Sequence, residues 1–188
     1  DALVTAASTK KSDKLCVSVS HTTRTMRPGE NNGANYHFVS PQTFSQMIEK
    51  EEFLEHAEVF GNHYGTSKAW VDDRLRNGWN VILEIDWQGT AQVKSIMPEA
   101  ISIFILPPSL ETLQTRLTSR GQDDSVIIEK RMAEAANELS HHAQADYLLI
   151  NDNFETALTD LISIIYGGYK PSAQEKAALE VLLQSLLP

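Results

Sequence analysis

The chain has 188 residues, of which 41% are hydrophobic and 22% are charged, and its formal net charge at pH 7 is −9. This length and composition are typical of a folded globular protein with a full core, and they exclude extensive disorder. The acidic balance argues against nucleic-acid polymers and anionic membranes as partners, because a negative surface repels both.

Cysteine content and the length of apolar runs indicate the cellular compartment of the protein. The single cysteine, Cys16, cannot form an internal disulfide, and we interpret it as a small buried hydrophobe rather than as a reactive thiol. No cysteine and histidine residues have the spacing of a zinc site. No apolar run approaches the roughly 20 residues that cross a bilayer, and the first residues lack the order of a secretory signal. The sequence therefore predicts a cytoplasmic protein.

Short apolar runs alternate with helical patterns along the chain. The runs lack polar alternation and are flanked by breakers, which is typical of strands buried on both faces of a parallel sheet. The predicted elements, in chain order, are strand 15–20, helix 41–50, helix 67–78, strand 81–83, strand 101–106, helix 110–121, helix 125–143, strand 146–150, helix 154–168 and helix 172–188. This order predicts an α/β protein with a parallel sheet and helices on both of its faces.

Capping residues define several of these helices. Ser40, which stands before Pro41, and Ser109 are predicted N-caps, and Ser67 begins the helical pattern between them. Gly78 is placed to end the second helix. In the last helix, leucines at helical spacing predict a packed stripe; these are Leu179, Leu182, Leu183 and Leu186.

Two arginines follow the first predicted strand, in the segment SVSHTTRTMRPGE at residues 18–30. Arg24 and Arg27 stand where strand ends of α/β proteins gather ligands, and the Pro28-Gly29 turn would hold them in place. Guanidinium groups bind phosphate oxygens in pairs. The alternative, pairing with surface carboxylates, stays open on this segment alone.

Further polar residues follow these arginines along the chain. They are Tyr36, Glu55 in the run EEFLEHAEVF, and Tyr64 and Thr66, which end a turn rich in glycine. Taken singly, Glu55 has the alternative of being a surface acid, and Tyr64 that of half-buried packing. The order of these residues along the chain, taken together, is a stronger indication of a binding site than any one of them alone.

Two carboxylates, Glu84 and Asp86, come directly after the predicted strand 81–83. An apolar strand that ends in carboxylates is typical of proteins that hold Mg²⁺, or its bound waters, beside a nucleotide phosphate. The segment therefore indicates a magnesium-assisted nucleotide site. No direct protein ligand of the metal is assigned.

The segments from about residue 16 to residue 166 together resemble the guanylate kinases, and most of all the bacterial enzymes. The matching motifs are SVSHTTRTMRPGE, NYHF, FLEHAEVFGNHYGTS, LEIDWQG, SIFILPPS, RLTSRGQDD, EKRMAEA and DYLLINDNF. The resemblance implies transfer of the terminal phosphate of ATP to GMP, with Mg²⁺. It also implies one domain over residues 1–188, with a P-loop-type core, a GMP-binding lobe at about 18–78 and a lid at 109–143, which close over the nucleotides.

The resemblance also implies roles for single residues on the GMP side. Glu55 would read the guanine edge, with Ser20 and Thr66 completing the contacts to the base. The GMP phosphate would be bound by Arg24, Arg27, Tyr36 and Tyr64. Asp86 and Glu84 would contact GMP and hold Mg²⁺ through water. The family has aspartate at the position of Glu84, so the role of Asp86 is the more secure.

On the ATP side, the resemblance places Arg116, Arg120 and Arg131 in the lid. Arg120 and Arg131 would neutralise the moving phosphoryl group, and Asn151 would contact the adenine. Without the resemblance, arginines on a solvated helix and a turn-forming asparagine are the plain alternatives.

Two departures from the family pattern leave alternatives open. The phosphate-binding loop G-x-x-x-x-G-K-[ST] is not found within the 188 residues and is expected before residue 1. Near Gly167-Gly168 the chain reads either as a join across missing residues or as a divergent terminal helix. A catalytically inactive protein-binding module is the alternative function, and a nonspecific anion-binding scaffold would leave Glu55 and Thr66 unexplained. Assembly as a homodimer or higher homo-oligomer is also an open expectation.

Overall fold

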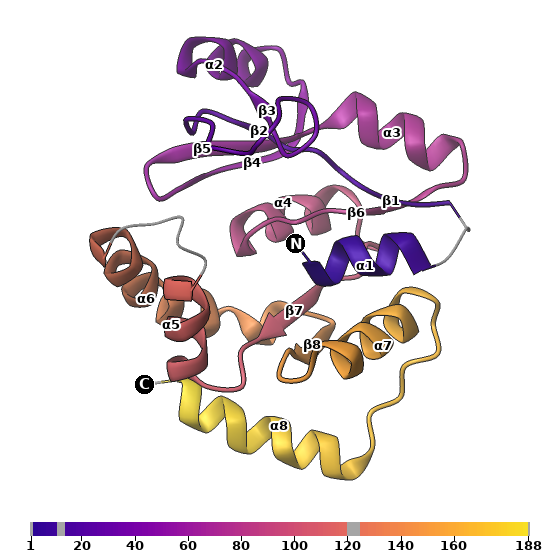
Figure 1. Ribbon diagram of the computed structural model, residues 1–188. Helices are drawn as coiled ribbons and strands as arrows, with labels where there is room; N and C mark the ends of the chain where they lie inside the picture. The colour runs from indigo at the N-terminus through magenta and orange to yellow at the C-terminus, as the bar shows by residue number, and fades with distance from the viewer. Residues whose placement is uncertain (1, 11–13, 120–124, 188) are drawn as a thin grey trace. The chain divides into compact units, whose positions relative to one another are not determined.

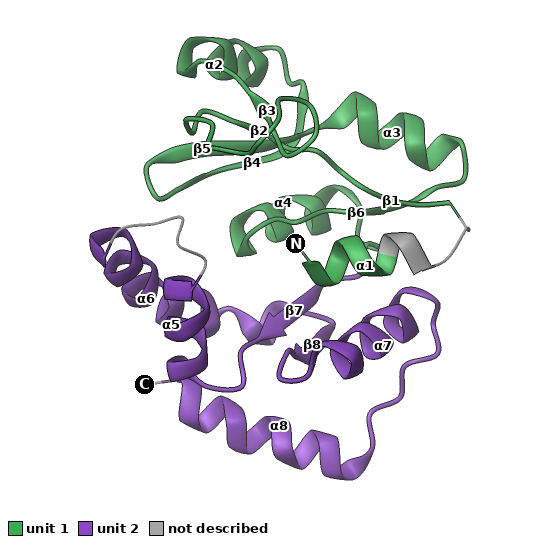
Figure 2. Ribbon diagram, in the orientation of Figure 1, with its two compact units in different colours: residues 1–100 green, residues 101–188 purple. Residues whose placement is uncertain are grey.

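The computed structural model describes residues 2–10, 14–119 and 125–187. The chain divides into two compact units, residues 1–100 and residues 101–188 (Figure 2). Helices and strands occur in both units, and each unit has an apolar core of its own. The predicted α/β fold class, with parallel strand pairs, is confirmed.

The first unit contains two sheets (Figure 1). Its elements are α1 (Ala2–Lys10), β1 (Leu15–Val17), β2 (His21–Thr22), β3 (His37–Phe38), α2 (Pro41–Glu49), β4 (Phe53–Val59), β5 (Asn62–Ser67), α3 (Lys68–Arg76), β6 (Asn80–Ile82) and α4 (Trp87–Ile96). β1 and β6 form a parallel pair in which Cys16 lies opposite Val81. The second sheet has the order β3-β2-β5-β4.

β4 and β5 are the two arms of an antiparallel hairpin. The turn between them consists of Phe60 and Gly61, whose φ angles are 53° and 74°. Two-residue turns with both φ angles positive suit the right-handed twist of hairpin strands, although only glycine adopts such angles without strain. A tight turn fixes the register, and here it places Glu55 opposite Thr66.

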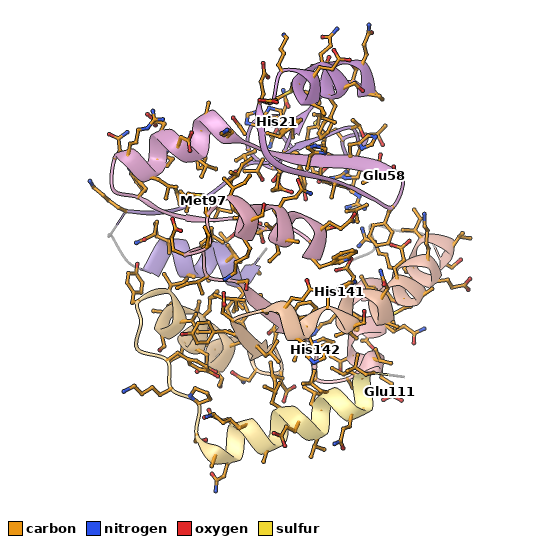
Figure 3. The ribbon with its side chains drawn as sticks, turned by 180° about the vertical axis from the view of Figure 1, so that it is seen from behind. His21, Glu58, Met97, Glu111, His141 and His142 are labelled. Carbon is orange, nitrogen blue, oxygen red and sulfur yellow. The ribbon has the colours of Figure 1, made fainter. Side chains whose placement is uncertain are left out.

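The apolar core of the first unit lies where α3 and α4 pack against β4. Leu54, Val71 and Val93 are its buried centre, with exposed fractions of 6% or less. Met97, the residue after α4, packs against this centre (Figure 3). The remaining contacts come from Trp70, Val81, Leu83, Ile85 and Ala100. Helix α4 and strand β4 are therefore joined by a shared core.

The second unit has its own parallel strand pair. Its elements are β7 (Ile103–Leu106), α5 (Leu110–Ser119), α6 (Ser125–Ser140), the 3₁₀ helix η1 (His142–Gln144), β8 (Tyr147–Ile150), α7 (Phe154–Ile165) and α8 (Ala173–Leu186). Leu106 of β7 pairs with Ile150 of β8. Leu106, Leu139 and Leu186 form the buried core cluster, and the other predicted leucines of α8 pack against it. The predicted packing role of the α8 leucines is confirmed.

The predicted caps Ser40 and Ser109 are also confirmed, and Ser67, where a helix was expected to begin, is an N-cap as well. The hydroxyl groups of Ser40, Ser67 and Ser109 accept hydrogen bonds from the backbone N–H groups of the residues three positions later. Gly78, two residues after α3, has a φ of 74°, which favours glycine there.

Some features of the fold differ from the expectations. The hairpin of β4 and β5 and the helix α4 were not predicted. Ile105 in β7 is 40% exposed, so the expected burial on both faces does not hold for this strand. Cys16 is partly rather than fully buried, and burial raises the pKa of its thiol. No helix within the described ranges has the length and apolarity needed to cross a membrane.

Candidate functional site

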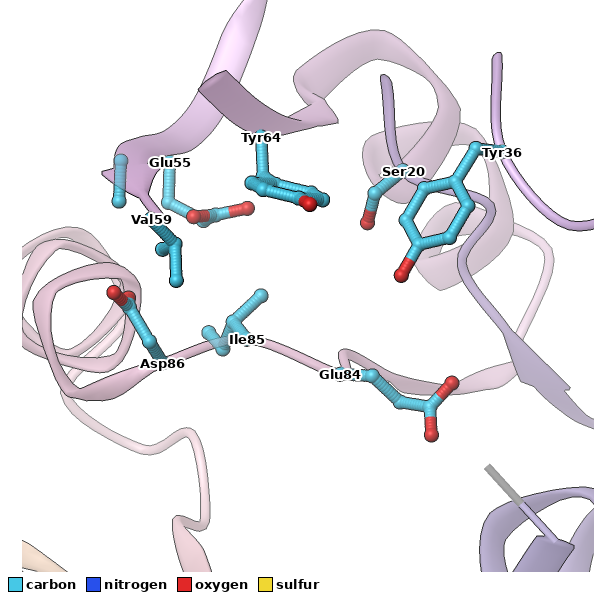
Figure 4. A pocket seen from close by; sticks show the side chains of 9 residues that line it. Ser20, Tyr36, Glu55, Val59, Tyr64, Glu84, Ile85 and Asp86 are labelled. Carbon is cyan, nitrogen blue, oxygen red and sulfur yellow. The ribbon is translucent and has the colours of Figure 1, made fainter. Parts of the chain in front are cut away.

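A pocket in the first unit brings together most of the residues predicted for GMP (Figure 4). The side chains from the hairpin face those from the segment that joins β6 to α4, with open space between the two groups. The residues lining the pocket are Ser20, Tyr36, Glu55, Ala57, Val59, Tyr64, Glu84, Ile85 and Asp86.

The carboxylate of Glu55 is the most buried charged group of the pocket, with 4% of the residue exposed. The hydroxyl of Thr66, on the neighbouring strand, donates a hydrogen bond of 2.6 Å to Glu55 Oε1. Thr66 is itself fully buried. The two residues meet because the hairpin register pairs them directly. Glu55 and Thr66, both predicted to contact the base, thus contact each other. The alternative that Glu55 is a surface acid is wrong.

Burial raises the pKa of Glu55, because a carboxylate is poorly solvated in this position. The hydrogen bond from Thr66 acts in the opposite direction, since it stabilises the charged form. The nearby charge of Asp86 raises the pKa further. A pocket of this kind favours a ligand that donates hydrogen bonds to the carboxylate and so replaces the lost water.

Tyr36 and Tyr64 form the aromatic part of the pocket. Their ring centroids lie 5.9 Å apart in an edge-to-face arrangement. Burial raises the pKa of Tyr36, so its hydroxyl stays protonated and can donate a hydrogen bond to an anion. The guanidinium carbon of Arg24 lies 5.3 Å from the centroid of the Tyr36 ring. The Tyr36 ring and the Arg24 guanidinium group therefore form a favourable cation–π contact beside the pocket.

Arg24 binds the carboxylate of Glu30 through both terminal nitrogens, at 3.0 and 2.7 Å. The side chains of the pair are 13% and 17% exposed. The hydrogen bond between them raises the pKa of Arg24 and lowers that of Glu30, so both groups stay charged. The backbone N–H of Arg27 donates to the same carboxylate at 2.7 Å. The carboxylate pairing considered as an alternative for these arginines therefore exists for Arg24, although within a partly buried cluster.

Asp86 begins the helix α4 rather than pointing freely into the pocket. Its Oδ1 accepts the backbone N–H of Gly89 at 2.8 Å, and its Oδ2 accepts Nε2 of Gln88 at 3.0 Å. Glu84, two residues earlier, is exposed and lines the pocket. A carboxylate at a helix N-terminus is favourable, so Asp86 stabilises the start of α4 beside the pocket.

The residues predicted for ATP lie in the second unit, except that Arg120 is outside the described residues. Arg116 of α5 donates to the carbonyl oxygens of Asn151 and Asp152, at 2.7 and 3.3 Å. These two bonds hold the turn after β8 against α5. Arg131 lies on α6 and is partly buried. The structure thus joins Arg116 to Asn151, two residues that were predicted separately.

Sequence reasoning missed several residues of the pocket. Ala57 and Val59 alternate with Glu55 along β4, and this period of two is the signal that could have revealed them. Ile85 stands between the two predicted carboxylates. Glu30 belongs to the segment that was singled out, but its contact with Arg24 was not predicted.

Comparisons with known proteins all identify the same protein family as similar to this chain. The family model described as guanylate kinase matches residues 1–167. A guanylate kinase of Saccharophagus degradans is 56% identical over 173 residues, which cover 92% of this chain and 84% of that protein. One of Vibrio cholerae is 53% identical over 171 residues, covering 91% of this chain and 83% of the relative.

A solved structure supports the same relationship. The crystal structure of guanylate kinase from Anaplasma phagocytophilum matches with a TM-score of 0.74 and 34% sequence identity. The match covers 98% of this chain and 89% of that one.

Proposed function

We propose a residue-level account of catalysis for this chain, which belongs to the guanylate kinase family and transfers the terminal phosphate of ATP to GMP, giving ADP and GDP. The observation that carries the account is the buried carboxylate of Glu55, held by Thr66 and facing a pocket with two tyrosine rings. No comparison favours the alternative of a catalytically inactive protein-binding module.

Glu55 selects the base. Its ionised carboxylate accepts hydrogen bonds from N1–H and the 2-amino group of guanine, an edge that adenine does not present. Ser20 and Thr66 complete the contacts to the base. A wrong purine leaves the buried carboxylate without donors, which costs several kcal/mol, on the order of a hundredfold or more in binding.

Arg24, Arg27, Tyr36 and Tyr64 bind the phosphate of GMP. Two guanidinium groups supply charge, and the phenol hydroxyls supply neutral donors. Glu30 keeps Arg24 oriented, so that little side-chain freedom is lost when the phosphate arrives.

Mg²⁺ is the cofactor in this proposal, with ATP as co-substrate. Within the described ranges, no three or more His, Cys, Asp or Glu side chains are grouped as in a metal site built from protein ligands alone. Glu84 and Asp86 fit the other common arrangement, in which one or two carboxylates hold the ion's waters while substrate phosphates bind it directly. The ion supplies charge neutralisation for the phosphates.

The arginines of the second unit act on ATP. Arg120 and Arg131, with Arg116, neutralise the charge that spreads over the moving phosphoryl oxygens, and arginines of this type contribute about a thousandfold or more to such transfers. Asn151 contacts the adenine, on a turn that Arg116 holds through two carbonyl groups. This proposal also includes three further expectations. They are a cytoplasmic location, a single catalytic domain with a closing lid, and assembly as a homodimer or higher homo-oligomer.

The test is a coupled assay of ADP release with GMP and ATP. Replacing Glu55→Ala should raise KM for GMP by about tenfold or more, while KM for ATP changes by less than about twofold, because the carboxylate contacts one base only. Glu58→Ala is the matched control, since Glu58 lies on the same strand with an exposed side chain. Equal weakening of both nucleotides would contradict the assignment.

A further inference from the structure

Gly89, in the first turn of α4, lies directly against the carboxylate of Glu55. A Cβ atom added at Gly89 would stand 2.5 Å from Glu55 Oε2 and 3.2 Å from Glu55 Cδ. Contacts between a Cβ and an oxygen do not normally come so close, so an alanine here requires the carboxylate to move. The same Cβ would meet Ile85 Cβ at 3.2 Å.

The backbone gives no reason for a glycine at this position. Gly89 is helical, with a φ outside the left-handed region that favours glycine. Inside a helix, glycine is less favourable than alanine. Its backbone N–H donates to the capping carboxylate of Asp86, but any residue except proline provides that donor. The space taken by Glu55, together with the close approach of Ile85, is therefore the remaining reason for a residue without a side chain.

The Glu55 carboxylate has little room to yield. The residue is 4% exposed, and its other oxygen, Oε1, is fixed by the hydroxyl of Thr66 at 2.6 Å. Rotating Oε2 away from Gly89 would strain or break this hydrogen bond. It would also turn the carboxylate out of the orientation in which Thr66 holds it.

The helix has little room to move away either, because Gln92 ties it to the strand. One turn after Gly89, Gln92 Oε1 accepts the backbone N–H of His56 at 3.1 Å, and Gln92 Nε2 donates to the carbonyl of His56 at 2.8 Å. The side-chain amide thus binds the peptide groups of the residue next to Glu55. The distance between α4 and β4 is fixed at the point where a larger residue 89 would push them apart.

We propose that Gly89 is a specificity-determining positioning residue for the guanine base. It leaves the space in which the Glu55 carboxylate lies flat against α4 and presents both oxygens to N1–H and the 2-amino group. This inference rests on the proposed function of Glu55. It adds that the shape of the carboxylate site is set by the helix α4.

The test is a double-mutant cycle with Gly89→Ala, Glu55→Ala and the combined variant. In the wild-type background, Gly89→Ala should lower kcat/KM for GMP by about tenfold or more, with kcat/KM for ATP changed by less than about twofold. The preference for GMP over IMP, which lacks the 2-amino group, should fall as well. In the Glu55→Ala background, Gly89→Ala should change kcat/KM for GMP by less than about twofold, because the displaced carboxylate is gone.

Ala91→Gly is the matched control. It makes the reverse exchange at an exposed position of the same helix, and kcat/KM for GMP should not change. An equal effect of Gly89→Ala in both backgrounds, or no effect on GMP in either, would overturn the proposal. If Glu55→Ala itself leaves kcat/KM for GMP unchanged, the proposed function fails together with this inference.

A Gly89→Ala variant that fails to fold also tests the proposal. If Gly89→Ala unfolds the protein, the combined variant with Glu55→Ala should restore the thermal unfolding transition, because the steric conflict is removed. A combined variant that stays unfolded would overturn the proposal.

Discussion

Glu55 illustrates the conflict between stability and recognition in a single side chain. Its burial raises the pKa of the carboxyl group, so the folded chain binds the proton more tightly than the unfolded chain does. The free energy of unfolding therefore falls as the pH rises from the ordinary glutamate range through the raised pKa. At pH values above the raised pKa the protein carries a charge that weakens its fold, and the hydrogen-bond donors of a ligand offset that cost.

Replacing Thr66→Val should move the pH dependence of GMP use. The Thr66 hydroxyl lowers the pKa of Glu55, and valine keeps the shape of threonine without the donor. In the wild type, kcat/KM for GMP should fall on acidification at a pH above the ordinary glutamate pKa. In the variant this fall should begin at still higher pH, and kcat/KM for GMP at neutral pH should drop by about tenfold.

The measurement is a pH profile of kcat/KM for each nucleotide. The profile for ATP serves as the internal control and should be the same in both proteins. A variant profile for GMP that coincides with the wild-type profile, or moves to lower pH, would contradict the role of this hydrogen bond.

Among the helices and strands, those with local signals could be predicted and those without could not. The caps Ser40 and Ser67 lie beside the helices that they begin, so the sequence alone reveals them. The hairpin was missed because β4 carries three charged or polar residues among its seven. Helix α4 was missed because it begins with Trp-Gln-Gly and has weak periodicity, while its N-cap Asp86 was interpreted as a ligand.

The candidate site likewise has a part that could be predicted from the sequence and a part that could not. Resemblance to the family places Glu55, Tyr64 and Asp86, and the structure brings them to one pocket. The closeness of Gly89 to Glu55 depends on how α4 packs against β4. No local pattern encodes that packing, so it emerges from the tertiary structure alone.

Helix α8 should stabilise the second unit through one face. Leu186 is 2% exposed in the core cluster, whereas Val181 on the same helix is 67% exposed. Replacing Leu186→Ala should lower the free energy of unfolding by about 2 to 5 kcal/mol, because it leaves a cavity.

Chemical denaturation followed by circular dichroism measures this difference, with Val181→Ala as the control. The control should stay within about 0.5 kcal/mol of the wild type. Equal effects of the two substitutions would show that α8 does not pack as described.

In the molecule as a whole, the pocket proposed for GMP lies within the first unit, among the residues that the structure describes. Each unit buries its own apolar cluster, one around Leu54 and the other around Leu106. Binding of GMP alone should therefore affect the two units unequally.

Hydrogen exchange measured with and without GMP tests this expectation. Saturating GMP should slow amide exchange in the hairpin, residues 53–67, by about tenfold or more, because a bound ligand suppresses local opening. Exchange in α8, residues 173–186, should change by less than about twofold. Equal slowing in both segments would contradict a GMP site confined to the first unit.

The bond between Gln92 and His56 also bears on solubility. β4 is the last strand of its sheet, and exposed strand edges can recruit strands of other molecules and start aggregation. By occupying both peptide groups of His56, the side chain of Gln92 blocks such pairing at the middle of this edge. One glutamine thereby limits strand pairing with other molecules at the very strand that carries the proposed base-reading carboxylate.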